Sequence, residues 1–165
     1  MTDRGHEEPG TPSGSPPASI SVQRRIEWSD TDASANYHNT AAFRLFEGAE
    51  TLLLARLGIL DEVYGRLPRV RLEADFLAGL SFHDIVRVAV EVREAGRTSV
   101  TYDFTIRRED RLCVRGRAVA VYVDRQGRPS PWSEEHRRLL LSAGPQPGEG
   151  LTPEPPGSAR DPSPS

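Results

Sequence analysis

Cysteine is nearly absent from this chain of 165 residues: Cys113 is the only one, so no internal disulfide framework can form. A single cysteine fits a reducing compartment such as the cytoplasm. The N-terminus has no apolar segment of the signal-peptide kind, and no apolar run is long enough to span a bilayer. The net charge of -3 gives no general attraction for nucleic acid. We therefore expect a cytoplasmic protein that binds neither membranes nor nucleic acids.

Both ends of the chain are rich in Pro, Gly and Ser. The first 19 residues hold four Pro, three Gly and three Ser, and residues 144–165 hold seven Pro, four Gly and three Ser. Such segments have too little apolar content to offset the entropy of ordering them. We predict a disordered tail at 1–19, one domain at 20–142 and a second disordered tail at 143–165. About 120 residues are enough for a single small domain.

Alternation of apolar and polar residues predicts five strands. The apolar positions are Ile20, Val22, Ile26 and Trp28; Val70, Leu72, Ala74 and Phe76; Val86, Val88, Val90 and Val92; Val100, Tyr102, Phe104 and Ile106; and, between residues 112 and 123, Leu112, Val114, Gly116, Ala118 and Ala120. The links EAGR and REDR have the length of hairpin loops. The last four strands are therefore predicted to form an antiparallel meander.

Residues 40–58, TAAFRLFEGAETLLLARLG, are predicted to form a buried helix because they are apolar over most of the helix circumference. Asn39 or Thr40 can cap its start, and Gly58 is well placed just after its end. Residues 133–141, SEEHRRLLL, predict a short C-terminal helix capped by Ser133.

A long apolar helix in a small domain must be covered, and a curved antiparallel sheet is the available partner. Such a sheet leaves one edge and one face open, which another copy of the chain can cover. We therefore predict a homodimer or homotetramer with its sites near the subunit boundary.

Four segments resemble the 4-hydroxybenzoyl-CoA thioesterase family over roughly residues 20–132: RIEWSDTDASANYHNTAAFRLFEGAE, PRVRLEADFLAGLSFHDIVRVAVEV, GRTSVTYDFTIRRE and GRAVAVYVDRQGRPSPW. The D-x-D junction before the helix is the most specific part. The resemblance implies a hotdog fold: an α+β domain whose five-stranded antiparallel sheet wraps around one long central helix. It also implies hydrolysis of acyl-CoA or acyl-carrier-protein thioesters by the second Asp, Asp32. The family usually has Gly where this chain has Ala35.

The polar junction at residues 30–39 suits that chemistry. Asp32 can act as a base toward water or as the nucleophile. The backbone amide of Asn39, at the helix start, can stabilise the oxyanion; if the loop is one residue shorter than in the family, His38 supplies that amide instead. The alternative role for Asp32 is to cap a turn, and we expect a structural role for Asp30.

Tyr37 and His38 are predicted to line the pocket. For His38 the alternatives are a local hydrogen bond at the helix start and a catalytic role. Glu47 is the rival carboxylate, because a sister hotdog group places its catalytic carboxylate in mid-helix; its alternative role is a buried salt bridge with a strand arginine. No metal site is expected, since the other histidines show no ligand spacing to His38.

The turn GRTS precedes the fourth strand. In related thioesterases this turn lies near the CoA nucleotide, so the resemblance implies that Arg97, Thr98 and Ser99 bind phosphate. The alternative is an ordinary basic turn.

These observations predict a cytoplasmic acyl-CoA thioesterase that needs no cofactor, because coenzyme A is part of the substrate. One alternative is a hotdog protein that binds acyl-CoA without catalysis. The other is a hotdog hydratase or dehydratase, although the Asp-plus-His signature of those enzymes is not visible further along the chain.

Overall fold

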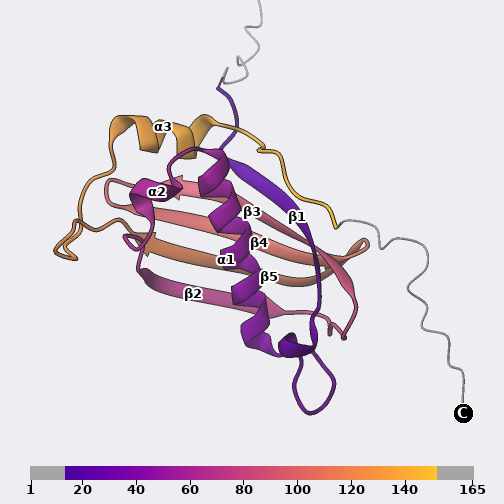
Figure 1. Ribbon diagram of the computed structural model, residues 1–165. Helices are drawn as coiled ribbons and strands as arrows, with labels where there is room; N and C mark the ends of the chain where they lie inside the picture. Colours follow the sequence, from indigo (N-terminus) through magenta and orange to yellow (C-terminus); the bar gives the residue numbers. More distant parts are fainter. Residues whose placement is uncertain (1–13, 152–165) are drawn as a thin grey trace, which may run out of the picture.

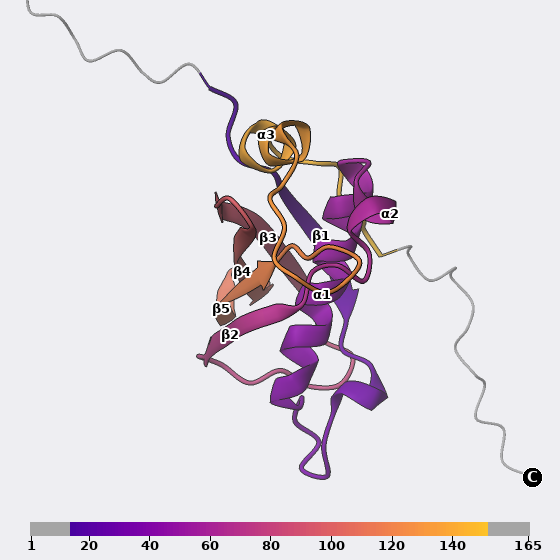
Figure 2. The same cartoon turned by 90° about the vertical axis from the view of Figure 1, so that its left-hand side faces the viewer.

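A five-stranded antiparallel sheet with a long helix across one face forms the body of the protein (Figures 1 and 2). The computed structural model describes residues 14–151. Its elements are β1 (Ser19–Arg25), the 3-10 helix η1 (Trp28–Asp30), α1 (Asn39–Arg56), α2 (Leu60–Val63), β2 (Arg69–Phe76), β3 (Ile85–Ala95), β4 (Ser99–Arg108), β5 (Arg111–Val121) and α3 (Glu134–Ser142). The predicted hotdog fold, including its short C-terminal helix, is confirmed. None of the helices in the described range is long and apolar enough to cross a membrane.

The central helix α1 forms where its apolar residues predict it. Gly58 follows its end with a φ of 73°, the left-handed conformation that glycine adopts most easily. The predicted cap is wrong by one residue, since His38, rather than Asn39 or Thr40, occupies the N-cap position. Ser133 caps α3 as predicted, accepting a hydrogen bond from the amide of His136.

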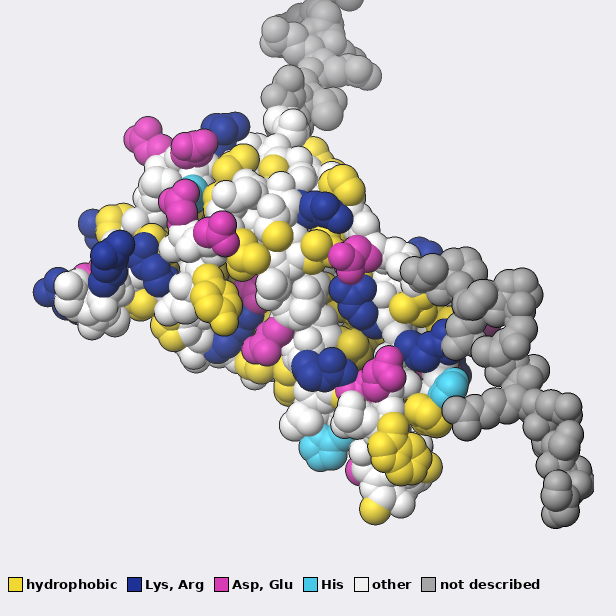
Figure 3. Space-filling model, viewed as in Figure 1, with side chains coloured by type: hydrophobic (Ala, Val, Ile, Leu, Met, Phe, Trp, Pro, Cys, Tyr) yellow, Lys and Arg dark blue, Asp and Glu magenta, His cyan; other side chains and the backbone are white. Residues whose placement is uncertain are grey.

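On the face of the molecule that carries α1, basic and acidic side chains are interspersed (Figure 3).

The strand order is β1-β3-β4-β5-β2. The predicted meander is therefore confirmed for β3, β4 and β5 but wrong for β2, which pairs with β5 instead of β3. Residues 77–84 cross the end of the sheet between β2 and β3. On the way, Leu80 accepts a hydrogen bond from the amide of Tyr37, and Ser81 forms a bridge with Asn36. Residues 77–84 therefore bind and support the loop that precedes α1.

Aromatic packing joins α1 to the sheet. The Phe46 ring on α1 stacks on the Phe104 ring of β4, with centroids 4.8 Å apart. Gly116 of β5 makes room for Phe104, because a Cβ at this position would lie 2.3 Å from Phe104 Cζ. The small residues of β5 therefore let a large aromatic pair fill the centre of the core.

A β-bulge alters the predicted pattern of β2. The register shifts between Arg69 and Arg71, so Val70 has no cross-strand partner and is largely exposed. Arg69 takes the inward position and forms a bidentate pair with Glu50 of α1. The predicted alternation of Val70, Leu72, Ala74 and Phe76 with polar residues is therefore broken at Val70.

The first strand ends earlier than predicted. After Arg25 the chain turns into η1, and Trp28 is 74% exposed instead of facing the core. Its ring makes an edge contact with the exposed ring of Phe82, with centroids 5.8 Å apart. The turn brings Asp30 beneath the start of α1.

A segment that we expected in the C-terminal tail, residues 144–151, runs along β1 instead (Figure 1). The backbone amide of Gln146 donates to the Ser19 carbonyl over 2.7 Å, and the backbone amide of Gln23 donates to the Glu149 carbonyl over 2.8 Å. Gly148 allows this approach, since a Cβ there would lie 1.8 Å from the carbonyl oxygen of Ser21. We call residues 144–151 the strap. Part of the predicted N-terminal tail is ordered too, since Ala18 is buried, its backbone amide donates to the Leu140 carbonyl over 3.0 Å, and Ser19 begins β1. The remaining parts of the predicted tails, at 1–13 and 152–165, lie outside the described residues.

Candidate active site

The polar junction folds into a closed loop between β1 and α1. The His38 amide donates to the Asp30 carbonyl over 2.6 Å, and Thr31 bridges to Tyr37 across the loop. Asp30 is buried; its carboxylate accepts from the Glu27 amide over 2.8 Å and pairs with Arg44 of α1. Asp30 therefore anchors the loop, in line with its expected structural role.

At the tip of the loop the backbone makes a tight turn. The Ala35 amide donates to the Asp32 carbonyl, and the Asp32 amide donates to the Asn36 carbonyl. Ala35 has a φ of 63°, in the left-handed region that disfavours residues with a Cβ. This gives a physical reason why glycine suits the position in the family that the sequence resembles.

The Asp32 carboxylate is exposed at this turn. It accepts hydrogen bonds from the Ser34 amide over 2.8 Å and from the Ser34 hydroxyl. The hydroxyl bond, followed by the amide bond, lowers the pKa of Asp32 below its ordinary value. Asp32 is therefore ionised near neutral pH, as a base or nucleophile must be. In this conformation it also caps its own turn, which was the alternative role expected for it.

His38 and Asn39 form the N-terminus of α1. His38 Nδ1 accepts from the Thr40 amide over 3.2 Å, so its ring makes the local hydrogen bond expected as one alternative. The His38 amide is occupied by Asp30, whereas the Asn39 amide has no acceptor among residues 14–151. Of the two amides considered for the oxyanion, that of Asn39 is therefore the one available, at the positive end of an 18-residue helix.

A pocket of about 360 Å³ opens beside this amide. Its lining residues are Asn36, Tyr37, Asn39, Phe76, Leu77, Ala78 and Gly79. The Tyr37 hydroxyl is buried and has no hydrogen-bond partner within the described part of the chain. Burial, and secondarily the neighbouring Cys113, raise the pKa of Tyr37 to about 12, so this hydroxyl stays protonated.

Glu47 lies on the exposed side of α1 and forms no ion pair with any described residue. The expected alternative role, a buried salt bridge with a strand arginine, belongs instead to Glu50, which pairs with Arg69. The Arg69 guanidinium also lies over the Phe46 ring, 5.0 Å from its centroid. Glu47 is eight residues beyond Asn39, about 12 Å along a helix that rises 1.5 Å per residue.

Comparison with known proteins shows the family of this chain. The sequence model of the thioesterase-like superfamily matches residues 26–140. The chain belongs to this superfamily. The comparison with curated proteins gives no match.

Solved structures from the same group of folds align along most of their length. A Thermus thermophilus thioesterase complexed with coenzyme A and Zn is 23% identical, with a TM-score of 0.68 over 73% of this chain and 90% of that one. A predicted thioesterase from Bacillus stearothermophilus is 25% identical, with a TM-score of 0.67 over 79% and 100%. A 1,4-dihydroxy-2-naphthoyl-CoA thioesterase from Synechocystis is 17% identical, with a TM-score of 0.66 over 74% and 95%.

The turn expected to bind CoA in this superfamily member lies far from Asp32. It joins β3 to β4, and its carbonyls hold the chain that follows β5: Arg97 accepts from the Trp132 amide and Thr98 from the Tyr122 amide. Asp32 follows β1, whose last residue pairs with Ile85 at the opposite end of β3. The 11 residues of β3 separate the two ends by about 33 Å. The structure therefore does not bring Arg97, Thr98 and Ser99 together with Asp32 in one chain.

Two buried polar features, a charge pair and a hydroxyl, were missed in the sequence. The Glu50–Arg69 pair was visible only as one acid on an apolar helix, where Glu50 is three and four residues from the apolar Leu53 and Phe46. Tyr37 lines the pocket as predicted, but nothing in the sequence marked its hydroxyl as buried and without a hydrogen-bond partner in residues 14–151. In residues 14–151, no group of three or more His, Cys, Asp or Glu side chains is placed to hold a metal ion.

Proposed function

We propose that this protein hydrolyses acyl-CoA thioesters to a free acid and coenzyme A. The observation that carries the proposal is the closed loop itself, which holds an ionised carboxylate, Asp32, and ends at the available Asn39 amide. Membership of the thioesterase-like superfamily supports the same reaction class. We propose no cofactor, because coenzyme A is part of the substrate.

In the proposed reaction the thioester carbonyl oxygen accepts a hydrogen bond from the Asn39 amide, aided by the α1 dipole. One such donor typically contributes about 3 kcal/mol to lowering the barrier. Asp32 either takes a proton from the attacking water or attacks the carbonyl itself, and the thiolate of coenzyme A leaves and is protonated. In the second case the acyl group is left on Asp32 as an anhydride, which water then hydrolyses to the free acid. Both bonds from Ser34 fall on Asp32 Oδ1, so Oδ2 can act while the turn stays intact.

We also propose that the working unit contains at least two chains, as a homodimer or homotetramer. β2 is an edge strand, and it exposes a large part of Val70, Leu72 and Phe76. Its outward residues Arg71, Glu73 and Asp75 carry both signs of charge, so two copies aligned antiparallel can match them. The other edge, β1, is covered by the strap.

This pairing would explain the distance between Asp32 and the GRTS turn. Antiparallel pairing of two β2 strands places the Arg69 end of one copy beside the Phe76 end of the other. Arg69 pairs with Ala120 at the end of the sheet that carries Arg97, and Phe76 lines the Asn39 pocket. Arg97, Thr98 and Ser99 of one copy therefore serve the Asp32 site of its partner in our proposal. The same pairing brings Glu47 of one copy toward that site and keeps it as the rival carboxylate.

A CoA thioester is the favoured substrate form over an acyl-carrier protein. One similar structure contains coenzyme A, and two others are named as thioesterases of 1,4-dihydroxy-2-naphthoyl-CoA and gentisyl-coenzyme A. For this chain we propose an acyl-CoA processed in the cytoplasm.

A second candidate is an acyl-CoA-binding protein without turnover. The observation that favours it is the Asp32 carboxylate, which is engaged in capping its own turn. The two candidates differ in one measurable step, the release of thiol.

A thiol-release assay over aromatic and aliphatic acyl-CoAs, with the wild type and Asp32→Asn, tests the proposal. We expect turnover by the wild type with at least one substrate and its loss in the variant. Binding of acyl-CoA with no thiol release from any substrate would support the binding protein instead.

A further inference from the structure

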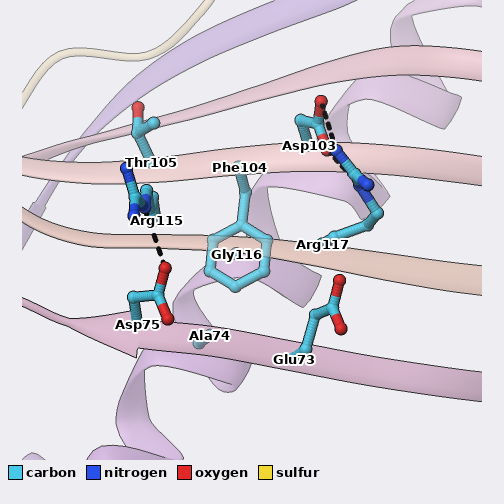
Figure 4. A pocket seen from close by; sticks show the side chains of 9 residues that line it. All are labelled: Glu73, Ala74, Asp75, Asp103, Phe104, Thr105, Arg115, Gly116 and Arg117. Atoms are coloured by element: carbon cyan, nitrogen blue, oxygen red, sulfur yellow. Dashed lines mark hydrogen bonds and ion pairs between the residues drawn. The ribbon is translucent and has the colours of Figure 1, made fainter.

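Arginines on the sheet face opposite α1 are mostly neutralised by carboxylates. Figure 4 shows part of this face, where Arg115 donates to Asp75 over 2.8 Å and Arg117 donates to Asp103 over 2.7 Å. Arg93 reaches the same Asp103 over 2.9 Å. Each of these two carboxylates, Asp75 and Asp103, therefore pairs with one or two arginines.

Arg87 and Arg107 lack such a carboxylate partner among the described residues. They are direct cross-strand partners on β3 and β4, both are exposed, and both point away from the helix side. Neither forms an ion pair with a described residue; Arg107 Nη1 donates only to the Asp110 carbonyl, over 3.2 Å. Like charges opposite each other destabilise a sheet, so an anion bound between them would stabilise this arrangement.

A pocket of about 390 Å³ lies over this pair. Its other side chains include Gln23, His83, Asp84, Arg108 and Glu109. Asp84 accepts through Oδ2 from Arg108 over 2.9 Å and from the Ser81 amide over 2.8 Å, so its charge is already paired. Gln23 accepts from the Leu151 amide through Oε1, which leaves its amide nitrogen as a donor. Glu109 is the one lining carboxylate without an ion pair among the described residues, so the uncommitted groups are mainly donors and cations.

We infer that this pocket binds a phosphate group. Two guanidinium groups side by side present planar pairs of N–H donors that match the oxygens of a phosphate, and a bound dianion would relieve the repulsion between them. The pocket lies at the end of the sheet where β1 leads into the Asp32 loop. The phosphate can come from coenzyme A bound at that loop or from a free phosphate ion. The inference does not depend on the proposed hydrolysis, because binding is measured without turnover.

The first test is thermal unfolding in inorganic phosphate and in chloride at equal ionic strength. We expect phosphate to raise the Tm of the wild type and to leave Arg87→Gln and Arg107→Gln unchanged. In chloride, Arg87→Gln should be at least as stable as the wild type, because one of two like charges is gone. Arg115→Gln, which removes a paired arginine from the same face, is the matched control and should keep the phosphate response.

The second test separates the two sources by calorimetry with coenzyme A and with pantetheine. If coenzyme A supplies the phosphate, Arg87→Gln should weaken coenzyme A binding by ~10-fold or more, the loss expected for a charge-assisted hydrogen bond, and leave pantetheine unaffected. Unchanged coenzyme A binding with a lost phosphate response identifies a site for free phosphate. Two results would overturn the inference. One is a wild type whose Tm is the same in phosphate and in chloride. The other is an Arg87→Gln variant that is destabilised in chloride and still responds to phosphate.

Discussion

Glu50→Gln should destabilise the fold strongly, whereas Glu47→Gln, one helical turn earlier, should not. Glu50 has only 6% of its side chain exposed and binds Arg69 through both oxygens. Removing one partner of a buried pair leaves the other charge uncompensated and typically costs about 3–5 kcal/mol. Arg69 retains 22% side-chain exposure, so water compensates part of this cost. We place the loss near the lower limit, about 3 kcal/mol.

For a domain of this size each kcal/mol shifts the Tm by about 3–4 °C, so Glu50→Gln should lower it by about 10 °C. Glu47 is exposed and unpaired within the described residues, and Glu47→Gln should change the free energy of unfolding by no more than about 0.5 kcal/mol. Thermal and urea unfolding followed by circular dichroism measure both values.

The double variant Glu50→Leu/Arg69→Met gives a further control, because replacing both charges by apolar groups is often close to neutral. It should recover much of the stability that Glu50→Gln loses. Together with the single variants Glu50→Leu and Arg69→Met it completes a cycle that gives the coupling energy. Equal losses for Glu47→Gln and Glu50→Gln, or a double variant that is no better than Glu50→Gln, would refute the assignment of the buried pair.

Four further predictions concern the site and the strap. Asp32→Asn should lower kcat by at least ~10²-fold with an unchanged Tm, and the chemistry lies elsewhere if this variant stays active while folded Glu47→Gln is dead. Ser34→Ala should raise the pKa of Asp32, because it removes the hydroxyl bond that lowers it most, and should move the acidic limb of the kcat/KM profile to higher pH; an unmoved limb would contradict this. Ala35→Gly should stabilise the fold by about 1 kcal/mol in urea unfolding, since φ is positive there, and a loss of stability would argue against the turn. Truncation after residue 142 should lower the Tm relative to a chain of residues 14–151, because it removes the hydrogen bonds of the strap to β1; equal Tm values would show that the strap is dispensable.

Much of the fold follows from local sequence periodicity. The alternation of β3 and β4 and the apolar circumference of α1 each predict an element that packs in the expected way. The position of β2 beside β5 was not predictable in this way, because strand order depends on contacts between residues far apart in the sequence. The bulge at Val70 was not predicted for a related reason. The Arg69 side chain points inward because it binds Glu50, which lies on another element, α1.

The candidate site was partly visible for the same reason. Asp32 and Asn39 lie on one short loop that closes on itself, so their common place at the junction before α1 follows from the chain, although Asp32 is not among the residues that line the Asn39 pocket. The availability of the Asn39 amide rather than that of His38 depends on where the Asp30 carbonyl lies, which required coordinates. The separation of Arg97 from Asp32 was also invisible, since a motif carries no information about which end of a sheet it occupies.

The strap has a consequence for the order in which the chain folds during synthesis. Arg24 of β1 bonds Glu149 of the strap, 125 residues later in the chain. At about 5–20 residues per second, a ribosome needs roughly 6–25 s to make that stretch. β1 is among the first structured segments to be made, yet its hydrogen-bonding partners on both sides, β3 and the strap, come much later. The β3 side of β1 can pair once residue 95 has been made, whereas the strap side stays open until almost all of the described domain exists. The first strand is therefore covered by nearly the last residues of the domain to be synthesised.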